Sequence, residues 1–275
     1  MVKFRIILHN VFILATVLLM SSCKDSKHVK DVSKINIKMT IIHFEQALFA
    51  CRSVPEIAQL AEKFPDFYDV YTNDLVAANV KRPGSSSQDI AVELYKYISH
   101  PDMDSLYTIT QAKYGNFEPY ANDLKTASKY IHYYFPEDNI EQVTTFISTF
   151  QYGAIYNQVN QSFGVGLDMY LGRNFEVYGM LSPQNFPTYR VKKFEPYRIV
   201  PNCIQTYADY KVPKYTSNKF IEEAVAEGKR LYLLDLLMPE HHDSLKINYL
   251  AGQIEYCKAQ EKNMWTYLIE EEVLF

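Results

Sequence analysis

The sequence lacks the motifs by which most enzymes are identified. It has no G-x-S-x-G for a serine hydrolase, no Walker sequence or G-x-G-x-x-G for a nucleotide, and no C-x-x-C for a redox pair. Its seven histidines include no pair at i and i+4, so the H-E-x-x-H helix of the zinc peptidases is missing. The sequence therefore predicts no catalytic residues, no cofactor and no metal of these standard kinds.

Basic clusters and flexible linkers are also scarce. The formal net charge is −4, and no helix or stripe concentrates arginine and lysine, so a nucleic-acid partner is not expected. Nine glycines against twelve prolines argue against long linkers. A hydrophobic content of 48% with 22% charged residues is typical of an ordered globular protein.

Cysteines are few, and their number beyond Cys23 is odd. Cys51, Cys203 and Cys257 have apolar neighbours and unrelated spacings. This pattern predicts buried free thiols, with a single disulfide among the three as the alternative.

The N-terminus carries the strongest signal. A basic start, M-V-K-F-R, precedes a short apolar run and then L-M-S-S-C, which resembles a bacterial lipoprotein box. We expect a lipoprotein signal peptide over residues 1–22, cleavage before Cys23, and a diacylglycerol on the Cys23 sulfur. Residues 23–34 would tether the protein to lipid of the outer membrane or the inner membrane. An ordinary signal with a chance cysteine and an uncleaved anchor are the alternatives.

Hydrophobic periodicity predicts an α+β fold, mostly helical with a small central antiparallel sheet, in a single domain over residues 35–275. Alternation over residues 35–41 predicts a strand, and β-branched and aromatic segments around 142–150, 154–157 and 165–171 predict three more. Helical spacing is found in eight segments: 43–50, 54–64, 88–99, 103–114, 118–135, 199–210, 218–237 and 250–271.

Three carboxylates lie in apolar surroundings. On a helical wheel of 218–237, Glu227 falls inside the apolar arc, which predicts burial and pairing with an inward arginine or lysine. Asp235 lies on the same arc, is predicted to be a second buried carboxylate, and could share a polar network with Glu227. For Asp168, in G-L-D-M-Y, a turn or capping role is favoured over catalysis.

The order of a sheet, a helix and a second helix with an E-G pair is found in many zinc peptidases. There the second helix supplies a glutamate ligand, which would be Glu223 or Glu227, but the preceding helix here has no histidine. We therefore hypothesise a degenerate, zincin-like scaffold with a groove lined by Tyr207, Glu223 and Glu227. An envelope metallohydrolase or peptidase with a non-standard metal site is the rival, and a structural assembly factor without a groove is a third class.

Several longer motifs occur in a fixed order: F-G-V-G-L-D-M-Y-L-G, Y-R-I-V-P-N-C-I-Q-T-Y, E-G-K-R-L-Y-L-L-D-L-L-M-P, D-S-L-K-I-N-Y and M-W-T-Y-L-I-E. Together they resemble the gliding-motility-associated lipoprotein GldB family. The resemblance implies an envelope lipoprotein acylated at Cys23 and associated with the machinery that moves gliding cells and its companion secretion apparatus. It supplies no catalytic residue.

These inferences favour a non-catalytic, lipid-anchored protein that binds envelope proteins or peptides. Members of the resembled family continue beyond the W-x-Y-x-I-E helix. We therefore expect Phe275 to mark a truncated product or gene model.

Overall fold

The computed structural model describes residues 29–213, 219–250 and 252–273. The predicted signal peptide, Cys23 and Phe275 lie outside these ranges. The chain divides into two units, Met1–Val32 and Ser33–Phe275. Residues 29–32 of the first unit form neither helix nor strand, and everything below concerns the second unit.

Four strands of the described chain form one mixed sheet in the order β1-β2-β4-β3. They are β1 (Thr40–His43), β2 (Gln142–Phe146), β3 (Ala154–Asn157) and β4 (Ser162–Gly166). β1 and β4 both pair in parallel with β2, and only β3 and β4 are antiparallel. The prediction of an α+β fold is confirmed, but the prediction of an antiparallel sheet is wrong for all but the β3–β4 hairpin.

The parallel core follows from the long helical connection between β1 and β2. Every residue of β4, and every residue of β2 after Gln142, is buried. Full burial is typical of parallel strands that are covered on both faces. The segment predicted as a strand at 35–41 pairs only from Thr40 onward, although Ile37 is buried.

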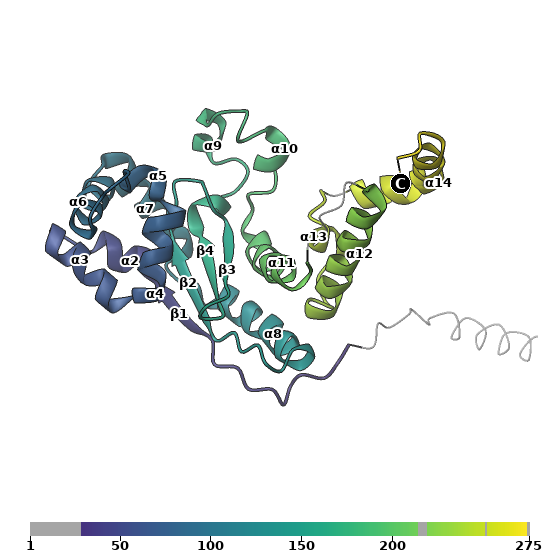
Figure 1. The fold of residues 1–275 in the computed structure, drawn as a ribbon, viewed down its shortest axis with the longest axis horizontal. Helices are drawn as coiled ribbons and strands as arrows, with labels where there is room; N and C mark the ends of the chain where they lie inside the picture. Colours follow the sequence, from purple (N-terminus) through teal and green to yellow (C-terminus); the bar gives the residue numbers. More distant parts are fainter. Residues whose placement is uncertain (1–28, 214–218, 251, 274–275) are drawn as a thin grey trace, which may run out of the picture. The chain divides into compact units, whose positions relative to one another are not determined.

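Helices α2 to α7 lie on one side of the sheet, with α8 and α11 on the other (Figure 1). Five helices before β2 match the predicted segments closely: α2 (Phe44–Phe49), α3 (Val54–Lys63), α6 (Ser87–Ile98), α7 (Pro101–Tyr114) and α8 (Glu118–Tyr134). Three shorter ones were not predicted from the sequence: α4 (Pro65–Val70), the π-helix η1 (Tyr71–Leu75) and α5 (Ala77–Val80). The starts of the predicted helices are encoded locally. A capping box of Ser86 and Asp89 opens α6, and prolines stand in the first turns of α3, α7 and α8.

Aromatic rings join these helices to the sheet. Phe44 contacts the ring of Tyr71 at 4.8 Å between centroids, and Phe67 contacts Phe146 of β2 at 5.6 Å. The buried Tyr71 hydroxyl donates to the carbonyl of Ile147 at 2.8 Å, so its polar end is satisfied.

The elements after β4 are mostly helical: the 3-10 helix η2 (Leu167–Tyr170), α9 (Glu176–Met180), α10 (Thr188–Val191), the 3-10 helix η3 (Pro196–Arg198), α11 (Ile199–Lys211), α12 (Phe220–Leu237), α13 (Asp243–Lys246) and α14 (Gln253–Glu270). The strand expected over 165–171 lies at Ser162–Gly166 instead, because Leu167–Tyr170 turns into η2. Helix α11 packs against β3, where the rings of Tyr207 and Tyr156 meet at 5.3 Å.

Helix α12 packs only through its C-terminal half. Leu233, Leu234 and Leu237 are buried, whereas Phe220 and Tyr232 from the predicted apolar face are exposed. No helix in the described ranges is long and apolar enough to cross a membrane.

Candidate functional site

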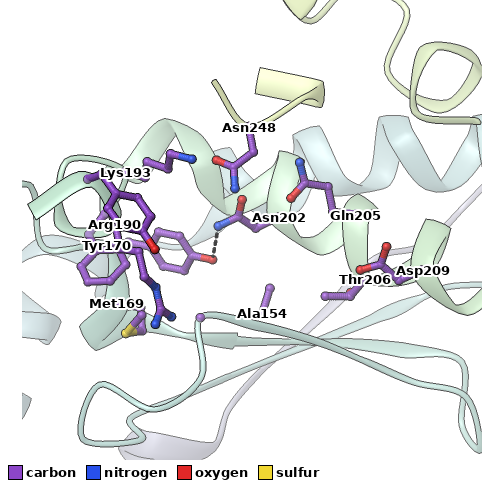
Figure 2. Close-up of a pocket in the computed structure, with 13 residues that line it drawn as sticks. Ala154, Met169, Tyr170, Arg190, Lys193, Asn202, Gln205, Thr206, Asp209 and Asn248 are labelled. Atoms are coloured by element: carbon purple, nitrogen blue, oxygen red, sulfur yellow. Dashed lines mark hydrogen bonds between the residues drawn. The ribbon is translucent and has the colours of Figure 1, made fainter. Parts of the chain in front are cut away.

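The site with the most polar side chains is a pocket between β3, α11 and the segment around α10, with a volume of about 450 Å³ (Figure 2). Ala154 of β3 lies on one side and α11 forms the other. The charged and amide side chains that line it are Arg190, Lys193, Asn202, Gln205, Asp209 and Asn248.

One side of this pocket is formed by Gly153 and Ala154 at the start of β3, which is an edge strand of the sheet. The amide of Gly166 donates to the carbonyl of Gly153 at 2.9 Å. In an antiparallel ladder, successive residues point their backbone groups alternately toward and away from the partner strand. Ala154 and Tyr156 therefore direct their N–H and C=O groups to the open edge, while Ile155 directs its groups to β4.

The helical side of the pocket is a polar stripe on an otherwise apolar helix. Asn202 and Thr206 are four residues apart and so share one face of α11, whose other face buries Cys203 and Ile204. The Asn202 amide donates to the Tyr170 hydroxyl at 2.9 Å. Its carbonyl oxygen is buried and has no hydrogen-bond partner among the described residues. This oxygen is an unsatisfied buried acceptor on a residue that lines the pocket.

The end of the pocket near Lys193 is positively charged. Arg198 is only 2% exposed, and its guanidinium donates to the Asn248 side-chain oxygen at 2.7 Å and to the Tyr249 carbonyl at 2.9 Å. Partial burial of the Lys193 amine, and next the charge of Arg198, lower the pKa of Lys193. Within the described part of the chain, no carboxylate forms an ion pair with either residue.

The opposite end carries a negative charge. Asp209 is exposed near the end of α11, and its carboxylate lies 3.6 Å from the Arg230 guanidinium. Figure 2 shows Asp209 and Thr206 at one end and Arg190 and Lys193 at the other. The pocket is therefore dipolar along its length.

Tyr207 does not line this pocket or join the two predicted glutamates. It is fully buried, and its hydroxyl donates to the Asp138 carboxylate at 2.5 Å, which also pairs with Lys211 at 2.6 Å. Burial, followed by the hydrogen bond to Asp138, raises the pKa of Tyr207 well above its usual range. The predicted groove of Tyr207, Glu223 and Glu227 is therefore wrong as a set.

Glu223 and Glu227 are exposed on α12, where they line a smaller hollow of about 270 Å³. Both carboxylate oxygens of Glu227 accept from Arg230 on the same helix. The predicted pairing with a basic residue is confirmed. The predicted burial is wrong: Glu227 is exposed, and the buried residues of α12 are Leu233, Leu234 and Leu237, further along the helix.

Asp235 is half-buried, whereas its ion-pair partner, Lys246, is almost completely buried. The Lys246 amine, on a residue only 3% exposed, lies 2.6 Å from Asp235 and 3.3 Å from Asp243. Glu227 pairs with Arg230 in a separate network. Among the described residues, no hydrogen bond or ion pair joins Asp235 to Glu227, so the shared network that the sequence suggested is not seen there.

The pairing of Lys246 yields a stability prediction. We expect Asp235→Asn to destabilise the fold by about 1–3 kcal/mol, because it removes the closer anion from a buried cation. Asp243→Asn, at a longer distance and on a more exposed side chain, is expected to cost less than about 1 kcal/mol. Urea denaturation of both variants measures the difference, and equal losses would contradict this assignment.

Asp168 has the structural role that the sequence favoured. It is fully buried and accepts hydrogen bonds from the backbone amides of Ser148 at 3.1 Å and Phe150 at 2.5 Å. The Asp168 carboxylate therefore holds the loop between β2 and β3, which leads directly to the open edge strand.

Glu45 and the cysteines also carry side chains that could take part in chemistry. Buried Glu45 accepts from the Thr145 hydroxyl at 2.7 Å and from the Gln111 amide at 3.2 Å. The described residues contain no group of three or more His, Cys, Asp or Glu placed to hold a metal ion. Cys51 and Cys203 are buried free thiols, as predicted, and Cys257 is a free thiol that is half-buried.

The sequence interpretation missed the pocket. Its residues come from β3, α10, α11 and the segment after α13, so no single motif contains them. One local signal was present: Asn202, Gln205 and Thr206 form a polar stripe at helical spacing in the apolar segment that became α11.

Comparison with known proteins gives one match. A family model described as gliding motility protein GldB matches residues 25–275, which is most of the chain. No curated protein and no solved structure matches significantly.

Proposed function

Because the chain belongs to the gliding motility protein GldB family, we propose that this envelope protein is lipid-anchored and non-catalytic and acts by binding a partner polypeptide. The lipoprotein-like L-M-S-S-C sequence supports an anchor at Cys23. The pocket beside β3 supports binding of a polypeptide, and its open strand edge is the observation that carries the proposal.

An extended peptide complements that edge. The outward N–H and C=O groups of Ala154 and Tyr156 would form ladder hydrogen bonds with a strand laid beside β3. Main-chain pairing of this kind supplies affinity for any sequence that can extend, and side-chain pockets supply selectivity. The site therefore suits a segment of polypeptide better than a compact small molecule.

The side chains on the α11 side also match a peptide. Asn202, Gln205 and Asn248 place side-chain amides along the pocket. The Gln205 amide nitrogen also donates to the Lys246 carbonyl, and the Asn248 oxygen accepts from Arg198. The Gln205 oxygen and the Asn248 nitrogen are therefore the groups that a peptide would meet. Side-chain amides both donate and accept, so they can pair with peptide N–H and C=O groups. The pocket has amides where a hydrolase would need a nucleophile with an adjacent base.

A defined peptide library tests the proposal. We would incubate the full chain in detergent micelles with synthetic heptapeptides and identify the bound ones by mass spectrometry. Peptides enriched by the wild type should bind at least about tenfold more weakly to Ala154→Trp, which fills the pocket beside the edge. Val159→Trp, at an 84% exposed position in the β3–β4 loop, should bind normally.

Two results would overturn the proposal: failure to enrich any peptide, or equal binding by Ala154→Trp and the wild type. Gln205→Trp, on the opposite side of the pocket, serves as a second blocking variant if Ala154→Trp loses its circular dichroism spectrum.

The rival, an envelope metallohydrolase with a non-standard site at Glu223 or Glu227, is tested separately by elemental analysis. Our proposal predicts no stoichiometric zinc in the purified full chain. It also predicts that Glu227→Ala has only the small stability cost of a surface ion pair, below about 1 kcal/mol. Near-stoichiometric zinc that is lost in Glu227→Ala would establish the rival.

A further inference from the structure

We propose that the pocket binds the C-terminal end of its peptide and recognises the free carboxylate at Lys193. This inference rests on the proposed function, because it specifies which part of a polypeptide occupies the β3 edge. It follows from three features of the pocket: an uncompensated positive charge, the direction of β3, and the packing at the charged end.

The positive charge at this end has no counterion within the described part of the chain. Arg198 is almost completely buried, yet its guanidinium bonds only to the neutral oxygens of Asn248 and Tyr249, and its Nε atom has no partner there. Lys193 stands beside it without a carboxylate. Arg198 does not line the pocket, but Lys193 does, so an anion that entered the pocket would pair with Lys193 beside this uncompensated charge.

The direction of β3 fixes which end of a bound strand would meet these cations. Ala154, at the beginning of β3, lines the pocket together with Lys193, whereas Asp209 lies at the other end. A peptide antiparallel to β3 would place its C-terminal end beside Ala154 and its carboxylate near Lys193. A parallel peptide with a free amino terminus would place an ammonium there, which like charges disfavour.

Packing at the charged end favours a chain terminus over a continuing strand. Met169, Tyr170 and Phe194 line this part of the pocket and are almost completely buried. Their positions are fixed by packing, since the Tyr170 hydroxyl is held by Asn202 and the Phe194 ring lies 5.0 Å from that of Tyr178. A carboxylate needs less room here than further residues would.

Matched peptides that differ only at the C terminus test the inference. Peptides enriched from the library would be resynthesised as free acids and as C-terminal amides, and their affinities for the full chain in micelles measured by calorimetry. The free acids should bind about tenfold more tightly, which is the size expected for one charge-assisted interaction.

Two lysine variants locate the effect. In Lys193→Met, which keeps the apolar stem, the preference for the acid should fall below about threefold. Lys192→Met removes the same charge from a neighbouring exposed residue that does not line the pocket, and should keep the full preference.

The outcomes separate the two proposals. Acids and amides that bind equally would overturn the terminal recognition and leave peptide binding intact. The same holds if affinity depends on an internal Asp or Glu of the peptide and not on its end. A preference that persists in Lys193→Met would place the carboxylate elsewhere. If no peptide binds in either form, the proposed function itself fails.

Discussion

Gly166→Ala is expected to destabilise the protein by about 4 kcal/mol or more, the largest effect of any substitution considered. Gly166 ends β4, and a Cβ atom on it would lie 1.9 Å from the carbonyl oxygen of Tyr152 and 3.2 Å from the Phe146 ring. The first contact is with backbone, so no side-chain rotation can relieve it.

Hydrogen bonds to Ser148 hold the Tyr152 backbone in place, so its carbonyl cannot easily move away from the added Cβ atom. The Ser148 hydroxyl donates to this carbonyl at 3.2 Å and accepts from the Tyr152 amide at 3.0 Å. Ser148 is in turn held by Asp168. The alanine must therefore separate β4 from this loop, which would also displace Ala154 at the edge of the pocket.

Alanine substitutions at two other glycines have smaller expected effects on stability and serve as comparisons. At Gly164 the nearest contact of an added Cβ is a side-chain atom of Ile155, at 2.6 Å, so Gly164→Ala should cost about 1–3 kcal/mol. At Gly228, in helix α12, a Cβ meets nothing within 4 Å, and Gly228→Ala should stabilise by about 0.5–1 kcal/mol. Urea denaturation followed by circular dichroism gives the order of the three free energies of unfolding. A Gly166→Ala protein as stable as Gly164→Ala would contradict the close contact between Gly166 and the Tyr152 carbonyl.

Asp168→Ala is expected to cost about 3–5 kcal/mol at neutral pH. The substitution leaves the amides of Ser148 and Phe150 buried without an acceptor, and each such group costs about 1–3 kcal/mol. It also releases a strained loop, because Thr149 and Phe150 have φ angles of 54° and 64°, which residues other than glycine seldom adopt.

The wild type should show the titration of Asp168 in its stability. Burial raises the pKa of the Asp168 carboxyl to about 6, and the amide hydrogen bonds oppose this only in part. Because the folded pKa lies above the unfolded one, the folded state binds more protons between about pH 4 and pH 6. This contribution to stability is complete below about pH 4 and is lost as the pH rises through 6, by about 2–3 kcal/mol in total.

Asp168→Asn isolates that contribution, since the amide has nearly the same shape and does not titrate. In a series of urea titrations, the free energy of unfolding of the wild type minus that of Asp168→Asn should decrease as the pH rises from 4 to 7. If this difference increases over the interval, the folded-state pKa of Asp168 is lowered and the loop prefers the carboxylate form.

Local signals explain which parts of the fold could be predicted from the sequence. Prolines in first turns and the Ser86–Asp89 capping box set helix starts within a few residues, so α3, α6, α7 and α8 were expected close to their observed bounds. Sheet pairing has no such signal. β1 and β2 are separated by four helices of ten or more residues and four shorter ones, and nothing local specifies that they pair in parallel.

The errors at the site have a similar cause. The helical wheel assigned Glu227 to a buried face because it treats α12 as packed along its whole length, but only the segment from Leu233 onward is buried. The sequence predicts Asp235 as the buried charge, whereas its partner Lys246, on a short helix and eleven residues further along the chain, holds that position. Lys193, Arg198 and Asn248 come together only through tertiary packing.

The residues around β3 fix the position of its edge. Asp168 fixes the loop before β3, Gly166 allows that loop to approach β4, and α11 covers one face of β3 while leaving its edge open. The same residues that stabilise the fold therefore also hold in place the edge at which we propose that a partner binds.

The most direct measurement of the central claim is amide hydrogen exchange, by NMR, of the full chain in micelles with and without a saturating selected peptide. Our account predicts that exchange at Ala154 and Tyr156 slows by at least about tenfold, because the peptide accepts from these outward amides. The Ile155 amide, which faces β4, should change little. Peptide binding that slows exchange elsewhere and leaves Ala154 and Tyr156 unchanged would contradict the claim that the partner binds at the edge of β3.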